Sequence, residues 1–282
     1  MSRILALAVL CAFPPATYAL CAAPRSSRAV LDALLSWCGK NGVGGLENVH
    51  IDEFEAGLGI FAARAILPGE ELLRIPLRLA LADRLIPGVD GKPPPPSPWR
   101  DAPWQAALAA RLSTEELDGS EWQPWLRTLP RGVQGLPLSM QPVLQYQSAA
   151  AELAALHADR AALAARTASA LSEAAAAEEA APSAARVEQA LTLASTRAFL
   201  LELEPGDPWA CCHAFVPLLD LFNHSPLDDS HVEWSLQPGA SLSLGCLSLT
   251  ARAPAKAGEQ LTLTYDPTAA NDVRPQPGAD CH

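Results

Sequence analysis

Three short segments of the chain place side chains that could do chemistry directly beside turns and apolar runs. Residues 55–62 read EAGLGIFA and are followed by a PGEE turn at 68–71. Residues 215–225 read FVPLLDLFNHS, so that an apolar run ends in an amide and an imidazole. Residues 257–266 read AGEQLTLTYD, in which a turn leads into an alternating strand that ends at Tyr265. Together the segments provide main chain that can approach a ligand closely, two hydrogen-bonding side chains and a phenol.

Each segment, taken singly, also has a plain structural explanation. The glycines of residues 55–62 let main chain approach a ligand, but they equally permit a bend. The segment is not a dinucleotide-binding fingerprint, because a third glycine and a following helix are missing. Asn223 and His224 could bind a ligand, or they could be a turn-capping asparagine beside an ordinary histidine. A tyrosine at a strand end, such as Tyr265, usually packs as an amphipathic side chain.

Metal and nucleic-acid chemistry find little support in the sequence. His213 and His231 lie near the 215–225 segment, but their spacing is not that of metal ligands, and the seven cysteines contain no C-x-x-C pair. The 20 Lys and Arg residues face 31 Asp and Glu residues, a net charge of -11 with no basic stripe to neutralise phosphates. We therefore expect neither a metal nor a nucleic-acid partner. A basic protein or peptide partner fits this charge, although solubility alone explains it equally well.

The elements expected around these segments alternate between short strands and a block of helices. Apolar residues at helical spacing predict helices, and short segments broken by Gly and Pro predict strands. The expected helices cover 29–40, parts of 102–129, the alanine-rich stretch 149–181, and 184–203. The expected strands lie within 46–82, 215–222, 231–238, 241–251 and 259–266. Strands that flank about one hundred helical residues predict one α+β domain with a helical insertion.

The N-terminus has the composition of a targeting segment. An apolar run at 4–13 follows a single charge, and it is too short to span a bilayer, so we expect no stable membrane insertion. Residues 23–28 are basic, contain serine and lack acids, as in the two-part import sequences of algae with complex plastids. We therefore expect residues 1–28 to be a targeting segment and a plastid to be the destination, with secretion or the cytoplasm as alternatives.

In their order along the chain, the three segments resemble the motifs of a SET domain. The similarity is closer to the branch of the Rubisco large-subunit lysine methyltransferases, which carries a helical insertion between its two β parts. Within the insertion, residues 119–130 (GSEWQPWLRTLP) resemble that branch's S-x-W-x-P-Y-L-x-x-L-P segment. Residues 195–199 (STRAF) resemble its R-S-R-x-F segment. The resemblance extends over about residues 30–272.

The resemblance implies an α+β fold, a SET β-fold of short strands with a large helical insertion. The implied division is an N-terminal SET part at 29–98, the helical insertion at 99–205, a C-terminal SET part at 206–270 and an irregular tail at 271–282. The family continues with S-N-A-E-L-x-x-x-Y-G-F and a helical substrate-binding domain, whereas this chain reads RPQPG at 274–278. We therefore expect the C-terminal substrate-binding domain to be absent from this chain.

The resemblance also implies S-adenosylmethionine as cofactor and a lysine-bearing protein as substrate. Tyr265 falls on the family's catalytic tyrosine, and Phe199 and Leu219 fall on the substrate side. These two are the residue types of the lysine enzymes, whereas the actin-histidine methyltransferases carry Asn and Trp near those positions. The implied cofactor-binding residues are Ala56, Gly57, Leu58, Arg197, Asp220, Asn223 and His224.

The implied chemistry is an in-line displacement at a methyl group that the adjacent sulfonium activates, which needs alignment more than acid or base strength. A free lysine has a pKa near 10.4, so the site must favour the neutral amine. A tyrosine hydroxyl and inward carbonyls can orient that amine. Two alternatives stay open: a SET-fold binding module with impaired catalysis, and a protein-histidine methyltransferase. The substrate protein, the number of methyl groups and the oligomeric state are left open.

Overall fold

The structure is a computed structural model of the 282-residue chain. It describes residues 27–54, 57–84, 102–116, 119–130, 147–174, 181–203, 211–237 and 245–265, with side chains in the long helix described over 158–173. Nearly all of the expected targeting segment (1–28) and the whole expected tail (271–282) lie outside these residues.

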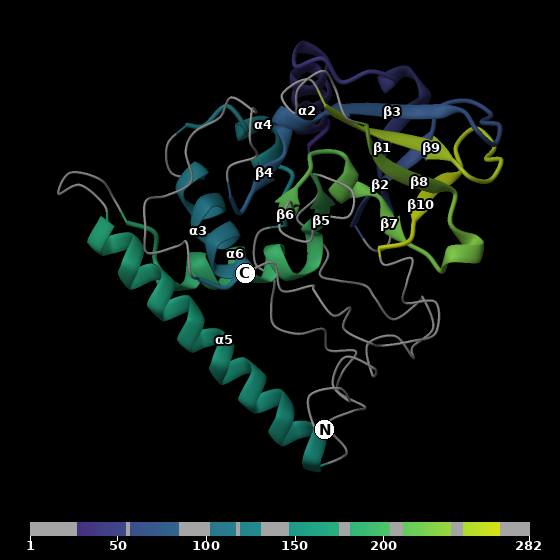
Figure 1. Cartoon of the computed structure of the whole chain (residues 1–282). Helices are drawn as coiled ribbons and strands as arrows, with labels where there is room; N and C mark the ends of the chain where they lie inside the picture. Colours follow the sequence, from purple (N-terminus) through teal and green to yellow (C-terminus); the bar gives the residue numbers. More distant parts are fainter. Residues whose placement is uncertain are drawn as a thin grey trace.

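The main sheet joins strands from both ends of the chain (Figure 1). Its seven strands are β1 (Val49–Phe54), β2 (Gly57–Ala62), β10 (Gln260–Leu263), β8 (Val232–Gln237), β9 (Cys246–Ala251) and β3 (Glu71–Pro76) in spatial order, with β7 (Asn223–His224) paired to β10. The first hairpin, β1–β2, therefore lies directly beside the last strand, β10. This non-local pairing is what brings the glycine segment and the tyrosine segment together.

A smaller sheet connects the β parts to the helices, and it corrects one expectation. It consists of β4 (Leu81–Ala82), β6 (Cys211–Phe215) and β5 (Phe199–Glu202) in the order β4-β6-β5. The helix expected over 184–203 was wrong at its end, because it stops at Arg197 and the next residues form β5. Residues of β5 alternate between buried and exposed, and they pair antiparallel with β6.

The apolar run at 215–222 is also not the strand that the sequence predicts. β6 ends at Phe215, and Pro217 and Leu218 then form a turn in which Leu218 has φ of +72°. A short 3-10 helix, Leu219–Leu221, follows before β7. The run is continuously apolar because the turn is buried in the core, where Leu218 and Phe222 are fully buried.

Five α-helices are described. They are α2 (Arg28–Lys40), α3 (Trp104–Glu115), α4 (Gln123–Leu126), α5 (Gln147–Ala174) and α6 (Ala184–Arg197). Of these, α3 packs against β4 and β6 of the small sheet. α3 and α5 both pack on α6, and the long α5 runs along the outside of the molecule (Figure 1). The helices expected at 29–40 and in the alanine-rich stretch are confirmed. Among the described helices, none combines the length and the hydropathy that crossing a bilayer requires.

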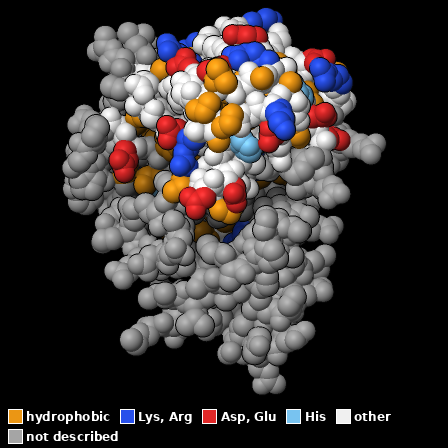
Figure 2. All heavy atoms as spheres, turned by 90° about the vertical axis from the view of Figure 1, so that its right-hand side faces the viewer, with side chains coloured by type: hydrophobic (Ala, Val, Ile, Leu, Met, Phe, Trp, Pro, Cys, Tyr) orange, Lys and Arg blue, Asp and Glu red, His pale blue; other side chains and the backbone are white. Residues whose placement is uncertain are grey.

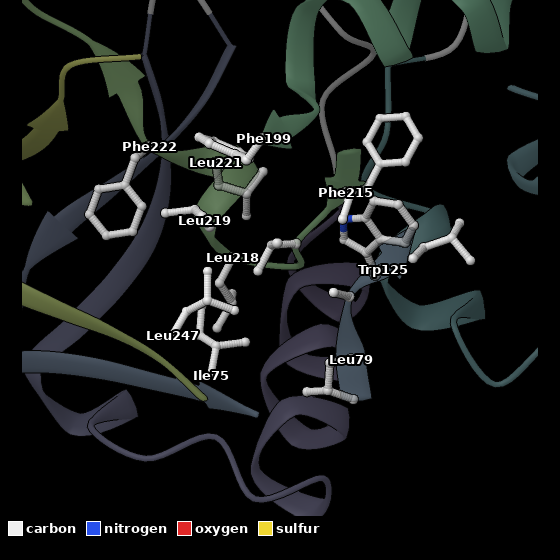
Figure 3. Packing of buried hydrophobic residues seen from close by; sticks show 14 of the residues in the cluster. Ile75, Leu79, Trp125, Phe199, Phe215, Leu218, Leu219, Leu221, Phe222 and Leu247 are labelled. Carbon is white, nitrogen blue, oxygen red and sulfur yellow. The ribbon is translucent and has the colours of Figure 1, made fainter. Parts of the chain in front are cut away.

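One continuous apolar core links both sheets and the helices. Figure 3 shows its centre, where Trp125 of α4 and Phe215 of β6 lie beside the leucines of the 218–221 turn. The Trp125 and Phe215 ring centroids are 5.7 Å apart. The turn that leads into Asn223 and His224 is thus held by side chains of the helical insertion.

Candidate active site

Strand β10 brings the three sequence segments to one place. Its first half pairs antiparallel with β2, Leu261 opposite Ile60, and its second half pairs parallel with β7, Thr262 opposite Asn223. Ser225 reinforces this junction, since its hydroxyl lies 2.8 Å from the hydroxyl of Thr262. Segments more than 160 residues apart in the sequence therefore meet at the end of β10.

The glycine segment and the asparagine are joined directly. Asn223 donates from Nδ2 to the main-chain oxygen of Leu58, at 3.2 Å. Beside this bond, Gly57 has φ of +116°, a conformation that L side chains rarely adopt. An ideal Cβ at Gly57 would have no atom of a described residue within 4 Å, so in the described part of the chain the main chain here borders open space. Ala56, which was expected to contact the cofactor, lies outside the described residues.

Tyr265 follows β10 and is held at both its main chain and its hydroxyl. The hydroxyl donates to the Phe222 main-chain oxygen at 2.9 Å, and the Tyr265 N–H donates to Nδ1 of His224 at 3.3 Å. The residue keeps 47% exposure, but the hydroxyl is its inward end. Burial is the largest cause that raises the pKa of Tyr265, and the nearby carboxylate of Asp220 adds to it. The phenol is therefore protonated at neutral pH.

His224 is a neutral hydrogen-bonding group in this arrangement. Burial lowers its pKa below the ordinary value. Because Nδ1 accepts the N–H of Tyr265, we assign the imidazole proton to Nε2, which leaves one ring donor for another partner. The imidazole lies 5.2 Å from the Tyr265 ring, centroid to centroid.

Arg197 and Asp220 form the charged part of the site. Arg197 donates from Nη1 to the main-chain oxygen of Asp220 at 2.8 Å, and the same nitrogen lies 3.8 Å from Oδ2 of the carboxylate. The Asp220 side chain is fully buried, whereas that of Arg197 is 28% exposed. Desolvation raises the pKa of Asp220 to about 6, although Arg197 and the indole N–H of Trp125 both act in the opposite direction.

The arrangement of these elements is shared with solved structures. The SET domain of LSMT bound to lysine and AdoHcy superposes with a TM-score of 0.65 at 18% sequence identity, covering 86% of this chain and 54% of that chain. Rubisco LSMT bound to AdoMet superposes with a TM-score of 0.59 at 18% identity, covering 88% of this chain and 57% of that chain. The chain has a SET fold. The α+β SET architecture predicted from the motifs is therefore confirmed.

The chain spans about half the length of these solved chains. A third SET-fold structure, Rubisco LSMT bound to sinefungin and monomethyllysine, matches with a TM-score of 0.58 at 16% identity over 84% of this chain and 52% of that one. No protein-family model matches the sequence. No curated protein matches it either. At this identity the likeness establishes the fold, and the roles of individual side chains remain predictions.

The two residues expected on the substrate side occupy different environments in this SET fold. Phe199, the first residue of β5, lies between two other aromatic rings: Tyr265 at 6.4 Å and Trp234 of β8 at 6.1 Å, both edge to face. Leu219 is fully buried in the 3-10 helix of the core. Phe199 thus forms an aromatic wall with the tyrosine, whereas Leu219 acts through packing.

Two tryptophans at or near the site were not predicted as site residues. Trp125 donates to the Asp220 carboxylate at 3.1 Å, and Trp234 packs against Phe199. Trp125 belongs to the 119–130 segment, whose resemblance to the family was the only available signal. Trp234 shows nothing in its local sequence beyond a strand pattern, because its contact depends on the distant strand β5.

The surface near β8 and β10 carries both signs of charge. Figure 2 shows Lys and Arg interspersed with Asp and Glu among hydrophobic side chains on this face. One example is Arg252, which lies 3.8 Å from Glu233 on β8. Within the part of the chain that the structure describes, no group of three or more His, Cys, Asp or Glu side chains could hold a metal ion.

Proposed function

We propose that this SET-fold chain transfers a methyl group from S-adenosylmethionine to a protein lysine. The observation that carries the proposal is the meeting of Gly57, Asn223 and Tyr265 around β10, beside main chain that borders open space. Two further features fit the cofactor: within the described part of the chain, Arg197 has guanidinium donors and neutral His224 has a ring donor that no described hydrogen bond engages.

The residues of the chain suit the different parts of the cofactor. Arg197 would hold the carboxylate end, because a guanidinium pairs with a carboxylate through parallel N–H donors. Asn223 and His224 would hold the remaining polar groups from β7, and the main chain near Gly57 would pass close beside them. When bound, S-adenosylmethionine supplies a methyl group that its sulfonium already activates for displacement.

Tyr265 and the side chains around it would orient the lysine amine and keep it neutral. The Tyr265 phenol donates to the Phe222 carbonyl, so its oxygen lone pairs stay available to orient an incoming amine. The Phe199 and Tyr265 rings offer apolar surface to the hydrocarbon stem of a lysine. Burial beside these rings favours the neutral amine, the form that attacks.

The decisive experiment separates binding from transfer. Calorimetry on the full chain measures affinity for AdoHcy, and tritiated S-adenosylmethionine with a lysine-rich protein mixture measures transfer. We expect Tyr265→Phe to bind AdoHcy within about threefold of wild type and to transfer about 10²-fold more slowly. Mass spectrometry of the product distinguishes lysine from histidine methylation.

Two outcomes would contradict the proposal. Absence of AdoHcy binding would exclude a cofactor-dependent enzyme. Binding by the wild type without transfer to any lysine-bearing protein would select instead the alternative of a SET-fold binding module.

A further inference from the structure

Besides Arg197 of α6, the helical insertion contacts Asp220 through the buried side chain of Trp125. This residue lies in α4 and is fully buried, and its indole Nε1 donates to Oδ2 of Asp220 at 3.1 Å. Figure 3 shows the indole beside Phe215, with its nitrogen turned toward the segment that carries Leu219 and Leu221. Donor and acceptor are 95 residues apart in the sequence.

Asp220 links Trp125 to Arg197, because it contacts both residues. Its main-chain oxygen accepts the Arg197 hydrogen bond, while its carboxylate is held by Trp125 and lies 3.8 Å from the same guanidinium nitrogen. Among the described residues, the second carboxylate oxygen, Oδ1, is buried and has no hydrogen-bond partner. The indole N–H is thus the side-chain donor that anchors this carboxylate, and the main-chain N–H groups of Asp220 and Leu218 also favour its charged form.

We propose that Trp125 is a positioning residue for the methyl-transfer site, since its indole N–H fixes the Asp220 carboxylate and thereby the main-chain oxygen that holds Arg197. The proposal rests on the proposed function for its effect on the cofactor. The anchoring of Asp220 itself does not depend on that function. Trp125 is expected to touch neither cofactor nor substrate and to act through Asp220.

The hydrogen bond from Trp125 should be measurable through its effect on the pKa of Asp220. Among the described residues, the titratable groups that interact with Asp220 are Arg197 from α6, the Cys38 thiol from α2 and the Tyr265 phenol. The pKa values of the thiol and the phenol are both raised, so these two are neutral, and the charge of Arg197 stabilises the carboxylate together with the N–H donors of Trp125 and the main chain. Loss of the indole N–H removes one of the interactions that hold the pKa of Asp220 down, so that pKa must rise further.

The test replaces only the N–H and keeps an aromatic ring. AdoHcy affinity of the full chain is measured by calorimetry from pH 5 to pH 8 for wild type and Trp125→Phe. We expect Trp125→Phe to weaken AdoHcy binding about three- to tenfold at pH 7. The acid limb, which is the fall in affinity as Asp220 becomes protonated at low pH, should move upward by about half to one pH unit, as expected for the loss of one charge-assisted hydrogen bond. A merely structural role would lower stability without moving this limb.

Two controls assign the effect. Trp122 lies in the same segment, is also buried and donates from Nε1 to the Leu79 main-chain oxygen at 3.1 Å, so Trp122→Phe removes an equivalent bond away from Asp220. It should leave the pH profile unchanged. Asp220→Asn should abolish the limb, and any limb that it retains belongs to His224, whose pKa is lowered.

The result that overturns the proposal is a Trp125→Phe profile equal to those of wild type and Trp122→Phe. If wild type binds no AdoHcy, the proposed function fails, and the pH dependence of thermal unfolding decides the positioning proposal instead. In that measurement, an upward shift of the Asp220 titration in Trp125→Phe alone supports the anchoring, and equal titrations in both tryptophan variants refute it.

Discussion

Gly57→Ala separates backbone strain from ligand contact at the edge of the site. At φ of +116° a non-glycine residue is strained by about 1–3 kcal/mol, and the described residues add no steric term, because none of their atoms lies within 4 Å of the new Cβ. For a chain of this size the melting temperature falls by roughly 2–4 °C for each kcal/mol. If the same open space receives the cofactor, the added methyl also weakens AdoHcy binding by about tenfold or more, which is about 1.4 kcal/mol.

Gly69→Ala and Gly258→Ala are matched controls for this prediction. Both glycines have positive φ, +86° and +80°, and neither would bring a Cβ within 4 Å of an atom of the described residues. All three variants should lose stability in thermal unfolding, but only Gly57→Ala should lose AdoHcy affinity in calorimetry. Wild-type affinity in Gly57→Ala would refute the placement of the cofactor beside this residue. An equal loss of affinity in all three variants would trace the effect to general strain.

Three other properties follow from the same geometry. Asn223→Ala removes a hydrogen bond to β2 and should cost about 1 kcal/mol in denaturant unfolding, together with about tenfold in AdoHcy affinity. Because burial raises the pKa of Asp220 to about 6, the folded chain binds this proton more tightly than the unfolded chain does. The stability from this residue is therefore greatest below about pH 4 and falls by about 3 kcal/mol as the pH rises past 6, and Asp220→Asn should remove this dependence from thermal unfolding. Burial also raises the pKa of Cys38 and Cys212 to about 12, so iodoacetamide at pH 8 should label the partly exposed Cys246 before either of these two, as peptide mass spectrometry would show.

Local periodicity predicted those elements whose pattern is complete within a short window. The helix at Arg28–Lys40 and the strand at Val232–Gln237 both have a repeating burial pattern that their own residues determine. The strand Phe199–Glu202 was missed because its four residues continue the apolar content of the preceding helix. Only pairing with β6, which begins nine residues after β5 ends, makes it a strand.

The run at 215–222 shows the converse limit. A continuous apolar segment is compatible with a buried strand, a buried helix or a buried turn, and composition does not distinguish these. Here Pro217 has no N–H for a ladder, and Leu218 adopts a positive φ that ends β6 and starts a 3-10 helix. The packing of the surrounding core, which cannot be read from the local sequence, compensates the backbone strain at Leu218.

Most of the candidate site could be named from motifs, but its geometry could not. The pairing of Thr262 with Asn223 joins residues 39 positions apart in a parallel register, and no local pattern encodes it. The roles of Trp125 and Trp234 were invisible for a related reason. A buried aromatic side chain at the site has the same local sequence signature as one in the core, and only its partner distinguishes the two.

The junction between α6 and β5 explains how the helical insertion and the SET β-fold share one site. Arg197 is the last residue of α6, where the helix dipole favours a cation, and Phe199 begins β5 two residues later. The register of β5 places Phe199 in the core and Leu200 outward, at 37% exposure. A slip of one residue would exchange these two side chains and withdraw the aromatic wall from Tyr265. The insertion therefore supplies Arg197, the Phe199 ring and, through Trp125 of α4, a hydrogen bond to Asp220. If the proposed function holds, substitutions that loosen the packing of the insertion should also lower methyl transfer.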